Sequence, residues 1–302
     1  YLIQWGGSIC IVIFFFKYTY NLPAYFGAYL PSGFAGGHGS AAVVGDLLTR
    51  GGVDDALSFT MFSATVGILF SVFGGIIFAK LFKRKFHIKN IKTKDATPII
   101  FKDISFIILS VSISFTLKPF VYEFLKISIP GFVIAVFVSF ILRFFIGTRD
   151  HGTLNKLSTL STDLLVIIGI GSINFLVIEK MIIPLSILYL FGLLQGILVF
   201  VFLSKKVFSK EEYFEKALFT WGWSIGGLVI GLNLVQSLDE LKNKTIVEEF
   251  AMTYLLLSPF EICLLLLGPW LLLNGYAFIM GPILLISAII LLIFMLKRPL
   301  NT

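Results

Sequence analysis

Long apolar stretches alternate with short polar segments along most of the chain. Because about 20 apolar residues suffice for a helix to cross a bilayer, several of these stretches are long enough to be membrane spans. After an apolar start at residues 1–16, spans are expected at 54–82, 104–125, 131–147, 158–178, 182–203, 248–273 and 277–296. Backbone groups inside a bilayer need internal hydrogen-bond partners, which helices supply. The pattern therefore predicts an all-α polytopic membrane protein.

Two segments interrupt this pattern with glycine. Residues 23–48 contain PSGFAGGHGSAAVVGD, and residues 213–238 contain WGWSIGG. Glycine permits backbone conformations that a Cβ would forbid, and Pro31 interrupts a helix that enters the first segment. In lipid, non-helical backbone occurs only where protein buries it or where it lines an aqueous cavity. Both segments are predicted to be re-entrant hairpins beside a transport pathway.

Composition supports a membrane protein surrounded by a lipid bilayer. Of the 302 residues, 57% are hydrophobic and 14% are charged, whereas about 25% are charged in soluble domains. The net charge of +7 comes largely from Lys80–Lys102, which no aromatic-basic face accompanies, so no nucleic-acid partner is expected. Cys10 and Cys263 lie in apolar stretches and predict neither a metal site nor a disulfide.

The basic segments predict the orientation of the spans, since positive loops face the cytoplasm. The loop at 83–103 is expected to be cytoplasmic, and counting spans then places Lys205 and Lys206 inside and Glu179 outside. The basic C-terminus also lies inside if the second glycine segment is a hairpin that enters from the cytoplasm. The first hairpin is then expected to enter from outside.

A weak internal repeat accompanies the two hairpins. Val53–Ile68 aligns without gaps on Val247–Ile262, and each stretch follows a glycine-rich segment. The predicted orientation runs the two helices in opposite directions, as in an inverted-topology repeat; chance similarity between apolar segments is the alternative. The predicted divisions are the remainder of an N-terminal repeat at 1–82, the loop at 83–103, a C-terminal repeat at 104–274, and an extra helix at 277–297.

The first hairpin and the helix after it resemble a known family. Ser32–Ala42, SGFAGGHGSAA, is similar to the SGGHGT-type loop of the bacterial sodium/glutamate symporters, and Ser63–Gly67, SATVG, is similar to their A-T-x-G helix start. The resemblance implies two halves of about five helices in inverted orientation, each with a re-entrant hairpin. It also implies sodium-coupled uptake of glutamate or a related carboxylate across the cytoplasmic membrane of a bacterium. It allows a homodimer, and it places roughly three helices before Tyr1.

The second half departs from the family pattern. Its loop at Gly222–Asn233 lacks two threonines and a proline of the family's loop, and Leu267 and Trp270 stand where the family's last helix has Asp and Asn. Glu261 is the carboxylate that remains nearby. Transport of another anion, with H⁺ in place of Na⁺ as the coupling ion, therefore stays open.

Candidate site residues follow from the hairpins and from charges within spans. A half-helix N-terminus favours a carboxylate, and a histidine titrates near neutral pH. An acidic residue near the middle of a span costs about 2.5–3.5 kcal/mol and usually has a function. The predicted substrate-binding residues are Gly37, His38, Gly39, Ser40, Ala41, Thr65, Gly226, Gly227 and Asn233. The predicted ion-coupling residues are Gly36, Asp163 and Glu261.

Each candidate also has a purely structural interpretation. His38 fits a cap between two half-helices, Thr65 fits a hydrogen bond to its own helix, and Glu261 fits a structural ion pair. No nucleophile-base set supports an enzyme, so none is expected, and no cofactor beyond the coupling ion is expected. An ion channel is disfavoured because no TVGYG-like filter is present. A transport-inactive scaffold is a further alternative.

Overall fold

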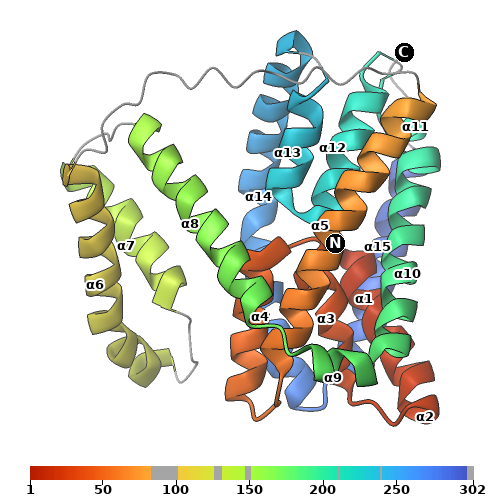
Figure 1. Cartoon of the computed structure of the whole chain (residues 1–302), viewed down its shortest axis with the longest axis horizontal. Helices are drawn as coiled ribbons and strands as arrows, with labels where there is room; N and C mark the ends of the chain where they lie inside the picture. The colour runs from red at the N-terminus through yellow and green to blue at the C-terminus, as the bar shows by residue number, and fades with distance from the viewer. Residues whose placement is uncertain (83–100, 126–130, 147–150, 210, 239, 298–302) are drawn as a thin grey trace. The chain divides into compact units, whose positions relative to one another are not determined.

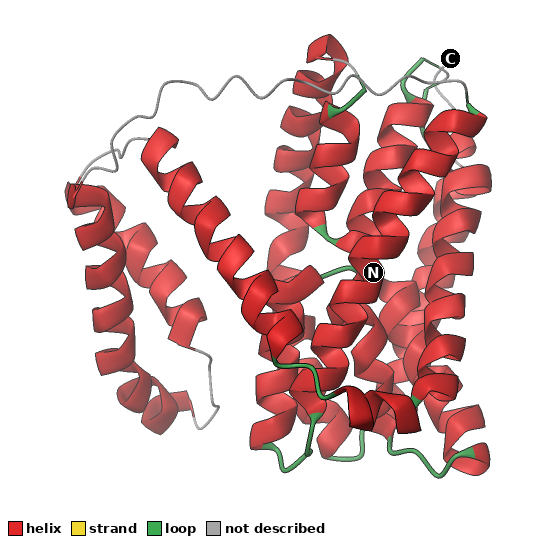
Figure 2. Ribbon diagram, viewed as in Figure 1, coloured by secondary structure: helices red, strands yellow, loops and turns green. Residues whose placement is uncertain are grey.

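The computed structural model describes residues 1–82, 101–125, 131–146, 151–209, 211–238 and 240–297, and every regular element among them is a helix (Figure 2). The predicted basic loop lies largely outside these residues. The chain forms two compact units, one of Tyr1–Lys89 with Val166–Thr302 and one of Asn90–Leu165. Each unit is described by itself.

Six described helices are long and apolar enough to cross a membrane: Leu2–Thr19, Ala56–Leu81, Asp103–Phe124, Ile182–Val207, Leu256–Leu273 and Ala277–Lys297. They carry many large apolar side chains on their outer faces, such as Leu291 and Phe294 on the last of them. Such extensive apolar exposure is abnormal for a surface in water and normal for one in lipid. The prediction of an all-helical, multi-pass membrane protein is confirmed at this level.

The smaller unit contains α6 (Phe101–Leu125), α7 (Gly131–Ile146) and the first part of α8 (His151–Gly171). The helices α6 and α7 pack against each other. The Phe140 and Phe144 rings, one turn apart on α7, pack edge to face with 5.5 Å between their centroids.

The larger unit holds the remaining elements. These are α1 (Leu2–Ile11), a π-helical turn (Val12–Phe16), α2 (Lys17–Thr19), a 3₁₀ turn (Ala24–Ala28), α3 (Tyr29–Phe34), α4 (Gly37–Arg50), α5 (Ala56–Leu81), α9 (Phe175–Lys180), α10 (Ile182–Leu198), a second π-helical turn (Val199–Leu203), α11 (Ser204–Val207), α12 (Tyr213–Gly226), α13 (Leu228–Gln236), α14 (Glu240–Leu273) and α15 (Ala277–Lys297).

Both glycine-rich segments form two short helices with a break between them. The first gives α3 and α4, which are separated at Ala35 and Gly36, and the second gives α12 and α13, which are separated at Gly227. Figure 1 shows α3 and α4 in the lower half of this unit and α12 and α13 in the upper half. The re-entrant course of these segments and the inverted repeat stay predictions.

Glycines let the outer helices pack closely. A Cβ on Gly6 of α1 would lie 2.6 Å from the backbone nitrogen of Leu285 on α15, and a Cβ on Gly281 would lie 2.8 Å from the Ile9 side chain. Small residues at such positions bring helix backbones together in lipid, where no hydrophobic effect drives association. The interior is aromatic, with Trp5, Tyr29, Phe16, Phe34, Phe200 and Phe214 fully buried.

Candidate functional site

The two helix breaks contact each other. A Cβ built on Gly227 would lie 3.4 Å from the Cα of Gly37, and one built on Gly37 would lie 3.6 Å from the carbonyl oxygen of Gly226. Gly37 has φ +61° and Gly227 has φ +88°, in the left-handed region that favours glycine. We call Gly36, Gly37, Gly226 and Gly227 the crossing site. Four of the predicted site residues thus meet at one point.

Helix α5 holds both breaks from one side. The backbone at Gly67 lies against the carbonyl oxygen of Ile225, with no room for a Cβ. One turn further along, Ser71 donates a hydrogen bond from Oγ to the Gly222 carbonyl oxygen at 3.2 Å. The Trp221 indole N–H in turn donates to the carbonyl oxygen of Ser71 at 2.9 Å. These contacts fix the end of α12 on α5.

The first pair of short helices, α3 and α4, packs on the same helix. The backbone at Gly33 in α3 lies directly against Ala64 in α5. Gly45 in α4 lies against Thr60, whose Oγ1 would be 2.6 Å from a Cβ at that glycine. The helix α5 therefore positions both breaks, the first through Thr60 and Ala64 and the second through Gly67 and Ser71.

Helix ends of both polarities converge on the crossing site. The helices α4 and α13 begin there, and α3 and α12 end there. A helix N-terminus has free N–H groups and about half a positive charge, while a C-terminus has free carbonyls and about half a negative charge. The free N–H groups of α4 belong to Gly37, His38 and Gly39, because α4 begins at Gly37. The site therefore offers donors to an anion and carbonyl oxygens to a cation.

His38 is buried beside this convergence, with 5% of its surface exposed. Its Nε2 lies 3.2 Å from Thr65 Oγ1, and that hydroxyl donates to the Met61 carbonyl oxygen at 3.0 Å. Because the Thr65 hydrogen is used in this way, Nε2 is the donor to Thr65 Oγ1. His38 Nδ1 is buried and has no partner among the described residues. In the neutral ring it is an unused acceptor.

Gln4 is a site residue that the sequence analysis missed. It is fully buried in α1, and its Nε2 donates to the Ser224 carbonyl oxygen at 2.7 Å, three residues before Gly227, where α12 and α13 are separated. Its Oε1 is buried without a partner in the described part of the chain. The available signal was a lone amide within the apolar stretch at 1–16.

The other predicted residues of α4 and α13 have different surroundings. Gly39 is exposed and has open space around it, whereas Ser40 packs its side chain against Gly36. Ala41 is fully buried on the opposite side of α4. Asn233 is exposed on α13, and no described contact joins it to the crossing site.

The two predicted carboxylates belong to other helices. Glu261 is half-buried on α14 and hydrogen-bonds the hydroxyl of Tyr254, which precedes it on the same helix. No contact among the described residues joins Glu261 to His38. Asp163 is exposed on the part of α8 that belongs to the smaller unit.

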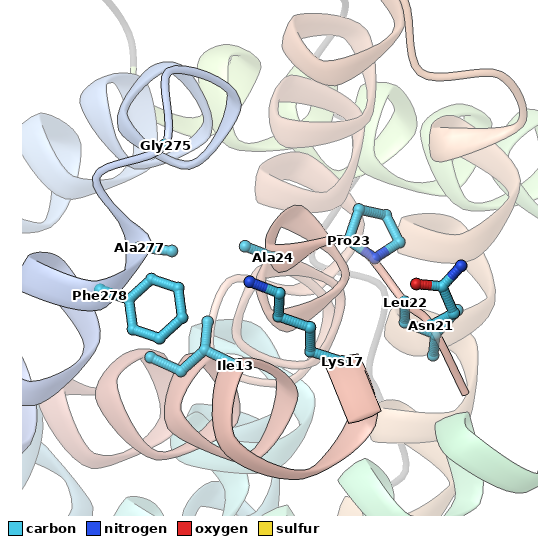
Figure 3. Close-up of a pocket in the computed structure, with 9 residues that line it drawn as sticks. All are labelled: Ile13, Lys17, Asn21, Leu22, Pro23, Ala24, Gly275, Ala277 and Phe278. Carbon is cyan, nitrogen blue, oxygen red and sulfur yellow. The ribbon is translucent and has the colours of Figure 1, made fainter. Parts of the chain in front are cut away.

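A separate cavity of about 370 Å³ lies near the end of the first helix. Figure 3 shows Lys17 directed into the space between Phe278 and Ala24. The ammonium nitrogen of Lys17 is 5.0 Å from the centre of the Phe278 ring, a cation–π geometry. None of the residues that line this cavity is a predicted site residue, so the cavity is distinct from the crossing site.

The described helices define the class of the molecule as a multi-pass helical membrane protein with two broken helix pairs that meet at their breaks. Comparison with protein-family models, with curated proteins and with solved structures gives no match to this chain.

Proposed function

We propose that the chain is a secondary active transporter that carries glutamate or a related carboxylate across the cytoplasmic membrane of a bacterium, by symport with Na⁺. The observation that carries this proposal is the contact between Gly37 and Gly227. Discontinuous helices whose broken ends meet are how several transporter folds build substrate and ion sites. The resemblance of Ser32–Ala42 to the sodium/glutamate symporters is the reason for choosing this solute and this ion.

The beginning of α4 and of α13 supports an anionic substrate. Each helix contributes about half a positive charge and free N–H groups, and Gly39 leaves open space beside them. The buried acceptors His38 Nδ1 and Gln4 Oε1 have no described partner. An unsatisfied buried acceptor costs about 1–3 kcal/mol, and the ammonium group of an amino acid is a donor that relieves this cost. Carboxylate and ammonium together describe an α-amino acid such as glutamate.

The ends of α3 and α12 support a coupling cation. Both helices end at the crossing site, and the carbonyl oxygen of Gly226 would lie 3.6 Å from a Cβ on Gly37. Unwound backbone carbonyls and half-helix C-termini coordinate Na⁺ or H⁺-linked groups in transporters. Gly36 belongs to this set, whereas Glu261 and Asp163 are candidates for a separate step of ion coupling. Coupling to H⁺ is the alternative that the retained carboxylate Glu261 favours.

The close contact between the breaks also favours a gate over an open pore. A Cβ added at Gly227 would already be in van der Waals contact with Gly37. A solute therefore cannot pass between the two breaks unless the two pairs of helices separate. We infer that they act as re-entrant hairpins from opposite faces, and that their separation alternates access to the site. A channel, an enzyme or a transport-inactive scaffold has no comparable observation in its favour.

The test is uptake of labelled glutamate, and of a panel of other carboxylates, by the protein in liposomes. Accumulation against a gradient that requires inward Na⁺ is the expected result. Accumulation that follows a pH gradient alone assigns H⁺ as the coupling ion. Downhill flux that ignores both gradients contradicts the proposal in favour of a channel, and absence of flux for every solute contradicts it in favour of a scaffold.

A further inference from the structure

A second hollow runs along the outer face of α10. This α10 groove has a volume of about 580 Å³ and is walled by α1, α10 with its π-helical turn, α11 and α15. Its lining includes Phe191, Leu194, Leu198, Phe202, Leu296 and, at one end, Lys206. Leu198 and Phe202 are 55% and 63% exposed. The groove is therefore mainly apolar, with the amide of Gln195 as a polar group along its length and Lys206 as a positive charge at one end.

The length of the groove matches one leaflet of a bilayer. From Phe191 to Lys206 the helix rises by about 22 Å at 1.5 Å per residue, and one leaflet with its headgroup region is about 20–22 Å thick. An acyl chain that lies along the groove therefore places its phosphate close to Lys206. The predicted orientation puts this end at the cytoplasmic face.

The π-helical turn brings the charge onto the apolar face. At 3.6 residues per turn, Lys206 would lie about 60° further round the helix than Phe191. The wider turn at Val199–Leu203 holds more residues and reduces this angle. Lys206 consequently lines the groove together with Phe191 and Phe202. A π-bulge inside an otherwise regular helix is often found at functional sites.

The adjacent lysine has a different position. Lys205 does not line the groove, and its ammonium nitrogen lies 5.9 Å from the centre of the Phe82 ring. Lys206 is exposed and makes no ion pair with a described residue. Lys297, at the end of α15, adds a second exposed charge near the same end, since α11 packs against α15.

We propose that the α10 groove binds an anionic diacyl phospholipid, with an acyl chain along α10 and the phosphate paired with Lys206. An apolar groove with a cation at the level of the headgroups is complementary to both parts of such a lipid. Basic pockets between membrane helices on the cytoplasmic side are general recognition sites for anionic headgroups. This site is separate from the crossing site and does not depend on the transported solute.

The experiment titrates the detergent-solubilised protein with phosphatidylglycerol and with phosphatidylcholine of the same acyl chains, and counts bound lipids by native mass spectrometry. Phosphatidylglycerol is expected to bind more tightly. Lys206→Gln is expected to weaken its binding about fivefold, the effect of one basic residue near an anionic surface. Lys205→Gln is the matched control, with the same change of charge one residue away, and is expected to bind as the wild type does.

Two further arms test the groove itself. Leu198→Trp fills its centre and is expected to reduce binding of phosphatidylglycerol without altering the charge. Deacylated glycerophosphoglycerol, which has the headgroup alone, is expected not to compete. Equal affinity for the two lipids, equal effects of the two lysine substitutions, unchanged binding by Leu198→Trp, or competition by the free headgroup would each overturn the proposal.

Discussion

Replacing Gly227 by alanine tests the backbone conformation on which the crossing site depends. Gly227 has φ 88° and ψ 169°, a region that only glycine occupies readily and that costs other residues about 1–3 kcal/mol. The added Cβ would lie 3.4 Å from the Cα of Gly37, which is an ordinary contact distance. Backbone strain and not steric overlap therefore sets the size of the effect. Gly227→Ala is expected to lower the free energy of unfolding by about 1–3 kcal/mol.

The measurement is unfolding in mixed micelles, followed by tryptophan fluorescence because Trp221 and Trp223 lie close to the break. Gly39→Ala is the matched control, since a Cβ there meets nothing within 4 Å. Alanine is favoured over glycine in a helix by up to about 1 kcal/mol. The free energy of unfolding of this control is therefore expected to be at least that of the wild type. If Gly227→Ala unfolds as the wild type does, α12 and α13 do not meet in the conformation described.

Three more substitutions test the surroundings of the crossing site. Gly67→Ala places a Cβ against the Ile225 carbonyl oxygen and is expected to lower the free energy of unfolding by about 1–3 kcal/mol. Hydrogen exchange at the end of α12 is expected to become faster, and unchanged exchange contradicts the contact. Thr65→Val keeps the shape but removes the acceptor for His38 Nε2, so the free energy of unfolding should fall by about 1–3 kcal/mol, and a neutral result excludes that hydrogen bond. Glu261→Gln is expected to reduce the Na⁺ or H⁺ dependence of uptake, and an unchanged dependence removes Glu261 from ion coupling.

The helices and their breaks were accessible from the sequence because local composition determines them. Apolar stretches of about 20 residues predicted the spans, and clustered glycines predicted interruptions at 23–48 and 213–238. Both segments do form pairs of short helices, broken at Ala35–Gly36 and at Gly227.

The end of α8 illustrates what local composition does not determine. A span was expected over 158–178, but α8 ends at Gly171 and α9 begins at Phe175. The Ser58 hydroxyl donates to the Ser172 carbonyl oxygen and accepts from the Asn174 N–H, both at 3.2 Å. A partner from a distant helix therefore satisfies the backbone at the break, and the sequence around Ser172 gives no sign of it.

For the candidate site, individual residues were predictable from the sequence but their tertiary contacts were not. Its glycines and His38 stand out in the sequence, but the contact between Gly37 and Gly227 joins residues from distant parts of the chain. The role of Gln4 also depends on tertiary structure, because its amide is notable only once Ser224 lies within hydrogen-bond distance. In contrast, Glu261 was singled out by its charge, and its described hydrogen-bond partner is Tyr254.

Cross-linking the two breaks tests the central claim most directly. In a variant with Cys10 and Cys263 replaced by serine, Gly37→Cys and Gly227→Cys place two thiols at the crossing site. Each glycine's Cβ position is within 3.9 Å of the other's Cα, and disulfides need Cβ atoms about 3.5–4.5 Å apart. Mild oxidation is expected to form the disulfide and to stop the uptake that the same variant shows before oxidation, and reduction is expected to return uptake to that reference level. Failure to cross-link, or undiminished uptake by the cross-linked protein, would contradict a transport pathway gated where the two helix breaks meet.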